Sequence, residues 1–319
     1  MVKVAVAGGS SIGVAREVIE ALISQKHDII VLSRNERRTP AHEVTPGVDW
    51  AQVDYNNPKE LEESLRGVHT LLSFVVIQDD PGSTAQKNLM DAAVRAGVKR
   101  FAPSEWATLE HMRWYAYKEE TRRYLEELNR QQTVLEYTLF QPGLFINYLT
   151  IPFKSAAHLH QTELPFDFNN RRVIVPENYD QIYVTLTTVQ DLAQVVARAI
   201  SFEGKWPVVG GVKGTDISLK QLISLGEKVR GGQPFQIETV KARDLESGTW
   251  SASWTPRFSH PAIPPELVSD TLSKTVVSGI LLGISAGCFK VSDEWNRLLH
   301  DYEFTTAEDF LTEAWTGKP

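Results

Sequence analysis

The first hundred residues alternate short apolar, largely β-branched runs with amphipathic stretches. Apolar runs separated by helices are typical of parallel strands that are buried on both faces of a sheet. Right-handed crossovers would place the helices on both faces, so we predict an α/β fold with a doubly wound parallel sheet. The predicted strands are Val2–Ala7, Ile29–Leu32, Gln52–Tyr55, Thr70–Val76 and Arg100–Ala102, and the predicted helices are Ala15–Ser24, Pro58–Leu65 and Thr84–Ala96.

The pattern loosens beyond Pro142-Gly143. Aromatic, proline and polar residues mix through Leu164–Pro176 and Gly248–Pro265, which predicts loops that line a pocket. The glycine-containing apolar stretch Val276–Phe289 is too short to cross a bilayer and is interpreted as a buried helix. The remaining predicted elements are helices Glu119–Asn129 and Thr187–Ile200 and strands Tyr137–Phe140 and Val208–Val209.

Charge and cysteine content exclude several classes of function. A formal net charge of -7 argues against a surface that attracts nucleic acid or an anionic membrane. The single cysteine, Cys288, excludes an intrachain disulfide and a zinc site of several cysteines, and it suits a reducing compartment. His158 and His160 lack a carboxylate at metal-ligand spacing, so no metal is expected. No signal peptide is visible, and we expect a cytoplasmic protein.

A glycine- and serine-rich turn joins the first predicted strand to the first predicted helix. A dinucleotide pyrophosphate needs main-chain N–H groups at a helix N-terminus and glycines that allow close approach. The spacing departs from the usual Gly-x-Gly-x-x-Gly, and the alternative is a plain strand-to-helix turn. In this context we favour nucleotide binding by Gly8, Gly9, Ser10, Ser11, Ile12 and Gly13.

The end of the second predicted strand distinguishes between two cofactors. NAD sites carry an acidic residue there, whereas a 2′-phosphate needs cationic and hydroxyl donors. This chain has Ser33 and Arg34, with Arg37 and Arg38 close behind. The arginine fork suits a phosphate, so NADP(H) is predicted. The alternative is a set of solvated surface arginines.

Two further pairs follow predicted strands. Asp54 and Tyr55 are positioned to line an adenine pocket, and Ser73 and Phe74 to lie beside the ribose and pyrophosphate. For each pair, ordinary packing at a strand end is an equally good interpretation.

Several segments together resemble the NmrA-like and isoflavone reductase-like family of atypical short-chain dehydrogenases. They are Gly8–Gly13, Val53–Tyr55, Asn88–Trp106, Gln141–Tyr148 and Thr305–Trp315. The resemblance implies a Rossmann domain that binds NADPH and a smaller C-terminal region that covers the nicotinamide. We expect the NADP(H)-binding domain over 1–150, with 180–212 returning to it, and the substrate-binding region over 151–179 and 213–319.

The family position also identifies a candidate proton donor. The Tyr-x-x-x-Lys pair of ordinary short-chain enzymes is absent, because Trp114 stands four residues before Lys118. Lys118 matches the lysine that isoflavone reductase-like enzymes keep, which implies contact with the nicotinamide ribose and proton transfer. Tyr115 is the second candidate. The alternative for Lys118 is a surface lysine paired with Glu110, Glu119 or Glu120.

Aromatic residues and strand ends supply the other candidates. Ser104-Glu105 ends its strand where the nicotinamide is expected, although a capping pair fits equally well. We expect a wall of Phe140, Pro142, Gly143 and Phe145, with Pro142 against the cofactor and Phe145 against the substrate. Trp250, Trp254 and Phe258 are candidates for stacking on an aromatic substrate, whereas Trp295 is expected in the core.

These observations favour an NADPH-dependent reductase of a small aromatic or polycyclic metabolite, as in secondary metabolism. The first alternative is an NADP(H)-sensing regulator that binds a partner protein without turnover. The second is a family member diverted to isomerisation or cyclisation. The chain has neither a Gly-x-Ser-x-Gly nucleophile elbow nor a Gly-x-x-x-x-Gly-Lys-Ser/Thr phosphate loop.

Overall fold

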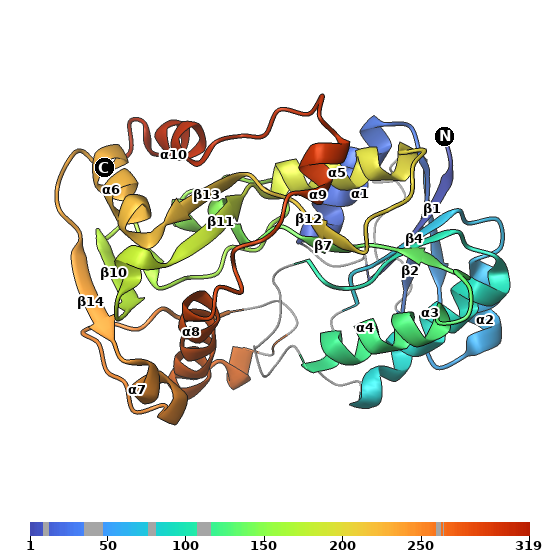
Figure 1. Ribbon diagram of the computed structural model, residues 1–319, viewed down its shortest axis with the longest axis horizontal. Helices are drawn as coiled ribbons and strands as arrows, with labels where there is room; N and C mark the ends of the chain where they lie inside the picture. Colours follow the sequence, from blue (N-terminus) through green and yellow to red (C-terminus); the bar gives the residue numbers. More distant parts are fainter. Residues whose placement is uncertain (9–12, 35–46, 76–80, 107–115, 260–262, 264) are drawn as a thin grey trace.

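A parallel sheet with helices on both faces forms the first part of the molecule (Figure 1). The computed structural model describes residues 1–8, 13–34, 47–75, 81–106, 116–259, 263 and 265–319. The sheet has six strands in the order β3-β2-β1-β4-β5-β6, and all of its neighbouring strands are parallel. The strands are β1 (Lys3–Ala7), β2 (Asp28–Ser33), β3 (Val48–Gln52), β4 (Thr70–Ser73), β5 (Arg100–Ala102) and β6 (Glu136–Tyr137).

Strand β1 shows why both faces are covered. Val4 and Val6 pack into the cluster that contains helices α1 and α5, whereas Ala5 and Ala7 pack into the cluster that contains α2, α3 and α4. Successive side chains of a strand point to opposite faces, so a strand that is apolar throughout needs a helical layer on each side. The doubly wound fold predicted from the sequence is confirmed. The helices are α1 (Val14–Ser24), α2 (Pro58–Ser64), α3 (Thr84–Ala96), α4 (Ala116–Leu128) and α5 (Val189–Ser201).

The chain changes pairing partner at Thr138. The N–H of Thr138 donates to the carbonyl of Phe101 in β5 at 3.2 Å, and the next N–H, of Leu139, donates to the carbonyl of Val208 at 2.9 Å. Strand β7 (Leu139–Gln141) then runs parallel to β12 (Val209–Gly211). The strand predicted at 208–209 therefore lies at Val209–Gly211, and it pairs with β7 in a separate two-stranded sheet rather than with the six-stranded sheet.

Two small mixed sheets form the other part of the molecule, on the left of Figure 1. Their orders are β14-β10-β9 and β13-β11-β8. Their strands are β8 (Leu144–Phe145), β9 (Phe166–Asp167), β10 (Arg172–Pro176), β11 (Tyr183–Thr187), β13 (Thr215–Ser218) and β14 (Gln236–Val240). The helices of the later chain are α6 (Leu219–Val229), α7 (Ala242–Ser247), α8 (Asp270–Ser285), α9 (Glu294–Leu298) and α10 (Ala307–Trp315). Short 3₁₀ helices lie at Pro81–Ser83, Ile146–Thr150, Tyr179–Gln181 and Pro265–Leu267.

Two predictions of local structure were wrong. The strand expected at Gln52–Tyr55 lies at Val48–Gln52, because β3 is an edge strand that is only partly buried and its polar residues hide the pattern. The loop expected at Leu164–Pro176 contains β9 and β10. Strand β10 is buried on both faces, and the polar turn that precedes it, with Arg171 at φ 53°, masked it in the sequence.

Candidate functional site

The segments predicted to bind a cofactor follow the strands of the parallel sheet. Strands β1, β2, β4 and β5 end at Ala7, Ser33, Ser73 and Ala102. Parallel strands bring their carboxyl ends to one edge, and ligands of doubly wound folds bind at that edge where the strand order reverses. Here the reversal lies between β1 and β4.

Gly8 lies where the end of β1 meets the end of β4. Its φ of +78° favours glycine, and a Cβ atom there would lie 2.8 Å from the carbonyl carbon of Phe74 and 2.9 Å from Val75 N. The two segments are also hydrogen-bonded, because Phe74 N–H donates to Ala7 O at 2.7 Å. No side chain fits between these strand ends.

Helix α1 begins directly after Gly13. Gly13 has φ 132° and provides no side-chain cap; Arg16 N–H donates to the Gly13 carbonyl at 3.0 Å, and the N–H groups of Val14 and Ala15 gain no side-chain hydrogen bond from the cap residue. Such N–H groups, together with the helix dipole, attract anions. Gly9, Ser10, Ser11 and Ile12, which join Gly8 to this helix, lie outside the described residues.

The end of β2 brings Arg34 close to Tyr55. Ser33 is buried at the last position of the strand, whereas Arg34 is exposed; Arg38 lies outside the described residues. Tyr55 is buried, and its hydroxyl donates to Leu32 O at 3.1 Å. Burial raises the pKa of Tyr55 to about 12, against the lowering effects of the Gly8 main chain and the Arg34 charge. Asp54 is exposed beside them and accepts a hydrogen bond from Asn56 N–H at 2.9 Å.

An aromatic stack lies after β4 and β5. The rings of Phe74 and Trp106 are 4.1 Å apart and nearly parallel, and Phe140 continues the stack at 5.6 Å from Trp106. The Trp106 indole N–H donates to Ser73 O at 2.7 Å, and the Ser73 hydroxyl donates to Gln86 at 2.9 Å. Sequence reasoning did not single out Trp106 as a site residue, although an aromatic directly after a Ser-Glu strand end was an available signal.

Lys118 is buried in the first turn of α4. Helix α4 was predicted from Glu119 but begins at Ala116, which places Lys118 inside it. Its ammonium group donates to the main-chain carbonyl of Glu105 at 2.5 Å, and its exposed fraction is 5%. Glu119 and Glu120 instead pair with Arg123 and Lys87, so the alternative of a surface lysine paired with either of them is wrong. Tyr115 and Glu110 lie outside the described residues.

Burial is the largest influence on the pKa of Lys118. Removal from water lowers the pKa of Lys118 to about 8; the Glu105 charge opposes this shift and the Arg122 charge adds to it. Glu105 is itself buried and forms an ion pair with Arg122 through both carboxylate oxygens. A lysine with this pKa is mostly protonated at pH 7 and can still release a proton near neutral pH.

The segment after β7 closes this region with buried residues. Phe140, Pro142, Gly143 and Phe145 are all buried, and Phe140 and Phe145 belong to the same core cluster as Phe74. Trp295 is fully buried and stacks on Phe140 at 5.5 Å, so its predicted place in the core is confirmed. Ser104 is half-buried at the bend after β5, next to Glu105.

The three aromatic residues proposed for substrate stacking lie in different surroundings. Trp250 is buried in a separate core cluster with residues of α7, α8 and β10, and its indole N–H donates to Ser278 at 2.7 Å. Trp254 is half-buried and lies beneath the Arg172 guanidinium group. Phe258 is half-buried, and its main-chain N–H donates to Ser273 at 3.2 Å. None of these contacts joins them to Lys118.

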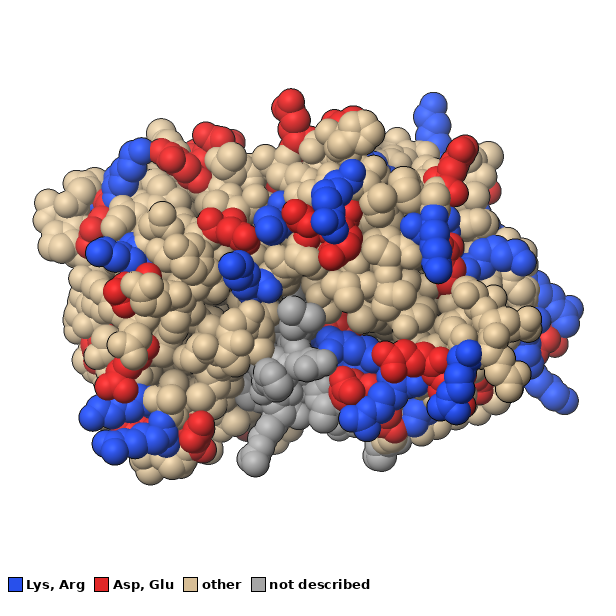
Figure 2. Space-filling model, viewed as in Figure 1, with Lys and Arg blue, Asp and Glu red and all other residues tan. Residues whose placement is uncertain are grey.

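The charges of the molecule are intermixed on the face that Figure 2 shows. Lys and Arg lie among Asp and Glu there, for example over α4, rather than in one broad basic patch. Across the described ranges, no group of three or more His, Cys, Asp or Glu residues is suited to holding a metal ion. Among those residues, no helix is both long and apolar enough to span a membrane.

Comparisons with known proteins find a matching family model and related sequences. The model of the NmrA-like family matches residues 2–247. Oxidoreductase BOA1 of Botryotinia fuckeliana is 30% identical over 287 residues, which cover 88% of this chain and 92% of that protein. Oxidoreductase swnN of Metarhizium robertsii is 28% identical and covers 100% of this chain and 98% of its own length.

Solved structures share the fold over nearly the whole chain. The NADPH-dependent quinone oxidoreductase QOR2 of Escherichia coli, complexed with NADPH, has a TM-score of 0.69 at 20% identity and covers 97% of this chain and 99% of its own. AtPrR2 with NADP⁺ and (+)pinoresinol has a TM-score of 0.69 at 16% identity and covers 98% of each chain.

Proposed function

The chain belongs to the NmrA-like family, and on that premise we propose that it is an NADPH-dependent oxidoreductase in which Lys118 supplies the proton. Membership confirms the resemblance drawn from the sequence segments. The observation that carries the proposal is Lys118 itself, buried and held against the Glu105 carbonyl at the carboxyl edge of the parallel sheet. The names of the curated relatives, both oxidoreductases, support it.

The described residues fit a dinucleotide. Gly8 keeps side-chain volume out of the space between the ends of β1 and β4, and α1 begins without a side-chain cap beyond it. Arg34 provides a cation and a planar donor fork at the end of β2, where an NADP 2′-phosphate is held in doubly wound folds. Tyr55 and Asp54 stand beside Arg34 to line the adenine pocket. We assign cofactor binding to 1–150 with 180–212, and substrate covering to 151–179 and 213–319.

In the proposed reaction, bound NADPH supplies a hydride and the chain manages one proton. Below pH 8 the Lys118 ammonium is charged, and the Glu105 carbonyl orients it by accepting one of its three N–H donors. Glu105 is anchored through its ion pair with Arg122. The ammonium donates its proton to the oxygen or carbon that gains negative charge on reduction. The buried rings of Phe74 and Phe140, with the half-buried ring of Trp106 between them, exclude water from the carboxyl edge.

The substrates that we propose are small aromatic or polycyclic metabolites of the kind made in secondary metabolism. The wall of Phe140 and Phe145 supports this class, as do the quinone and pinoresinol named for structures of the same fold. The test is to titrate the protein with NADPH and NADH, and then to follow NADPH consumption with a panel of quinones, aromatic ketones and enones. Binding without consumption across the panel would favour a regulator, and absence of NADPH binding would exclude the proposal.

Replacing Arg34 with leucine should reduce the preference for NADPH. Charge-assisted hydrogen bonds contribute about 1.5–3 kcal/mol each, so the Kd for NADPH is expected to rise at least about tenfold. The Kd for NADH, which lacks the 2′-phosphate, should change less than about twofold. Both values can be measured by fluorescence titration. The exposed Arg66, after α2, provides the control variant Arg66→Leu; equal weakening of both cofactors in Arg34→Leu would contradict the assignment.

Turnover should decrease as the pH rises through about 8, because the proton-donating form of Lys118 is the protonated one. The Glu105 carboxylate raises the pKa of Lys118, so Glu105→Gln is expected to move this inflection to lower pH. Glu127→Gln, on the same helix but exposed and paired with Arg130, should leave the inflection in place. The measurement is a pH profile of kcat/KM, and a profile that is flat from pH 6 to 10 would remove Lys118 as the donor.

A further inference from the structure

A cavity of about 230 Å³ lies among the small sheets, apart from Lys118. Its walls come from the 3₁₀ helix at Ile146–Thr150, from β9 and the turn after it, and from Trp254. Tyr148, Leu149, Ile151, Pro152, Leu164, Phe166 and Phe168 supply most of its apolar surface. Most of its lining belongs to the proposed substrate-covering segments, but neither Lys118 nor Glu105 contributes to it, so it is separate from the proposed proton donor.

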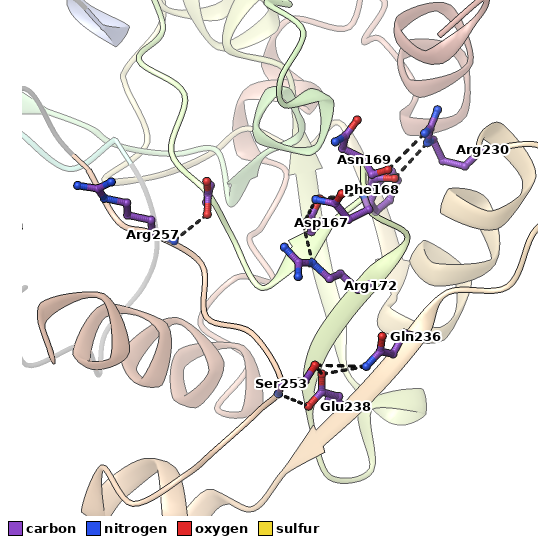
Figure 3. A network of polar contacts seen from close by, with 11 residues as sticks. Asp167, Phe168, Asn169, Arg172, Arg230, Gln236, Glu238, Ser253 and Arg257 are labelled. Carbon is purple, nitrogen blue, oxygen red and sulfur yellow. Dashed lines mark hydrogen bonds and ion pairs between the residues drawn. The ribbon is translucent and has the colours of Figure 1, made fainter. Parts of the chain in front are cut away.

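Arg172, at the start of β10, contributes hydrogen-bond donors to the lining of this cavity. Its Nε donates to Asp167 at 2.8 Å, and its guanidinium group lies over the Trp254 ring, 4.2 Å from the ring centre. The terminal nitrogens extend away from Asp167, and no hydrogen bond to a described residue occupies them (Figure 3). One edge of the guanidinium is therefore fixed, while the other edge can donate to a ligand.

The polar turn that carries this arrangement is held from two sides. Asp167 also accepts hydrogen bonds from the main-chain and side-chain N–H groups of Asn170, at 3.0 and 2.7 Å. Arg230 donates to the carbonyls of Phe168 and Asn169, at 3.1 and 3.3 Å (Figure 3). A site that is positioned in advance binds a ligand without first paying an ordering cost.

The charges of the residues that line the cavity determine whether it favours a neutral or a charged ligand. Glu163 and Asp167 contribute two carboxylates against the single guanidinium of Arg172, so the lining is net negative and disfavours an anion. The free donor edge of Arg172 can nevertheless donate hydrogen bonds to an oxygen acceptor of a ligand. An apolar cavity of about 150 Å³ holds benzene, so the volume here suits one or two rings.

We propose that this cavity is a second binding site, which takes a neutral planar molecule of one or two rings that carries a carbonyl oxygen. The carbonyl accepts from the terminal nitrogens of Arg172, and the ring packs between Trp254 and the apolar wall around Leu149 and Leu164. The site does not depend on NADPH or on Lys118.

Three probes of similar size and shape test this inference on the protein without NADPH. Acetophenone carries the neutral carbonyl, benzoate replaces its methyl group with a charged oxygen, and cumene replaces its carbonyl oxygen with a methyl group. By ligand-observed NMR titration, acetophenone is expected to bind with a Kd on the order of 1 mM, as suits so small a ligand. Benzoate and cumene should each bind at least about fivefold more weakly.

Variants then locate the binding. Arg172→Met should weaken acetophenone binding at least about fivefold, and Trp254→Phe about threefold. Arg257→Met is the control. Arg257 is exposed and its main-chain N–H donates to Glu163 of the cavity lining, so replacing its side chain leaves that hydrogen bond in place (Figure 3). A thermal unfolding curve of each variant shows whether it is folded. If Arg172→Met is not folded, acetophenone binding is compared in Trp254→Phe instead.

Several outcomes would overturn the proposal. They are benzoate binding more tightly than acetophenone, unchanged acetophenone binding in folded Arg172→Met and Trp254→Phe, and loss of acetophenone binding in Lys118→Ala. If Lys118→Ala loses turnover and keeps acetophenone binding, the second site and the reaction centre are separate. A further outcome is that neither Lys118→Ala nor added NADPH changes any activity, while Arg172→Met still loses acetophenone binding. The proposed function then fails, whereas the second binding site is supported.

Discussion

Lys118→Ala is expected to lower NADPH-dependent turnover by about 10²–10⁴-fold, the usual contribution of a positioned proton donor. The Kd for NADPH should change by no more than about threefold, because the glycine turn and Arg34 supply most of the cofactor contacts that we propose. The physical basis is the burial of Lys118, which lowers its pKa to about 8 and leaves its ammonium held by the Glu105 carbonyl. Steady-state turnover and NADPH titration on the same preparation provide the measurement.

Lys87 provides a matched control for that substitution. It lies on α3, is partly exposed and forms an ion pair with Glu120 of α4 at 2.6 Å, so Lys87→Ala removes a lysine that contacts the same helix. Exposed ion pairs contribute about 0–1 kcal/mol, and turnover should stay within about twofold of the starting protein. If Lys118→Ala behaves like Lys87→Ala, the role assigned to Lys118 is wrong.

Gly8→Ala is expected to reduce both stability and cofactor binding. The new Cβ would lie 2.8–2.9 Å from the main chain of Phe74 and Val75, at a backbone φ of +78° that disfavours side chains. Strain and overlap together should lower the free energy of unfolding by about 2–4 kcal/mol. The main-chain N–H groups of the proposed phosphate site would shift with Gly8, and the loss of two charge-assisted hydrogen bonds raises the Kd for NADPH about 100-fold or more.

Gly97→Ala separates these two effects. Gly97, at the end of α3, has a φ of +75°, but a Cβ atom there would meet nothing within 4 Å. We expect a loss of about 1 kcal/mol in unfolding free energy and no change in NADPH binding. Chemical denaturation and NADPH titration of both variants make the comparison. Similar NADPH affinities for Gly8→Ala and Gly97→Ala would count against a phosphate site at the end of β1.

The parts of the fold that local pattern specifies were predictable. Helix α3 begins and ends at the predicted residues Thr84 and Ala96, because an amphipathic run closes at Gly97, which adopts the left-handed conformation. Strand β5 also matches its predicted bounds. Edge strand β3 was displaced by several residues, because its exposed polar residues carry no periodic signal of burial.

The candidate site was likewise predictable only in part. Sequence alone determined that glycines, Arg34 and Lys118 follow or adjoin strands of one parallel sheet, and it identified the family. Only the tertiary structure decided that Lys118 is buried against Glu105, that Trp106 stacks between Phe74 and Phe140, and that Arg172 lies over Trp254 at a cavity. Strand, helix and turn propensities act over a few neighbouring residues. Burial, pKa and stacking instead depend on segments that are distant in the chain and meet only in the folded protein.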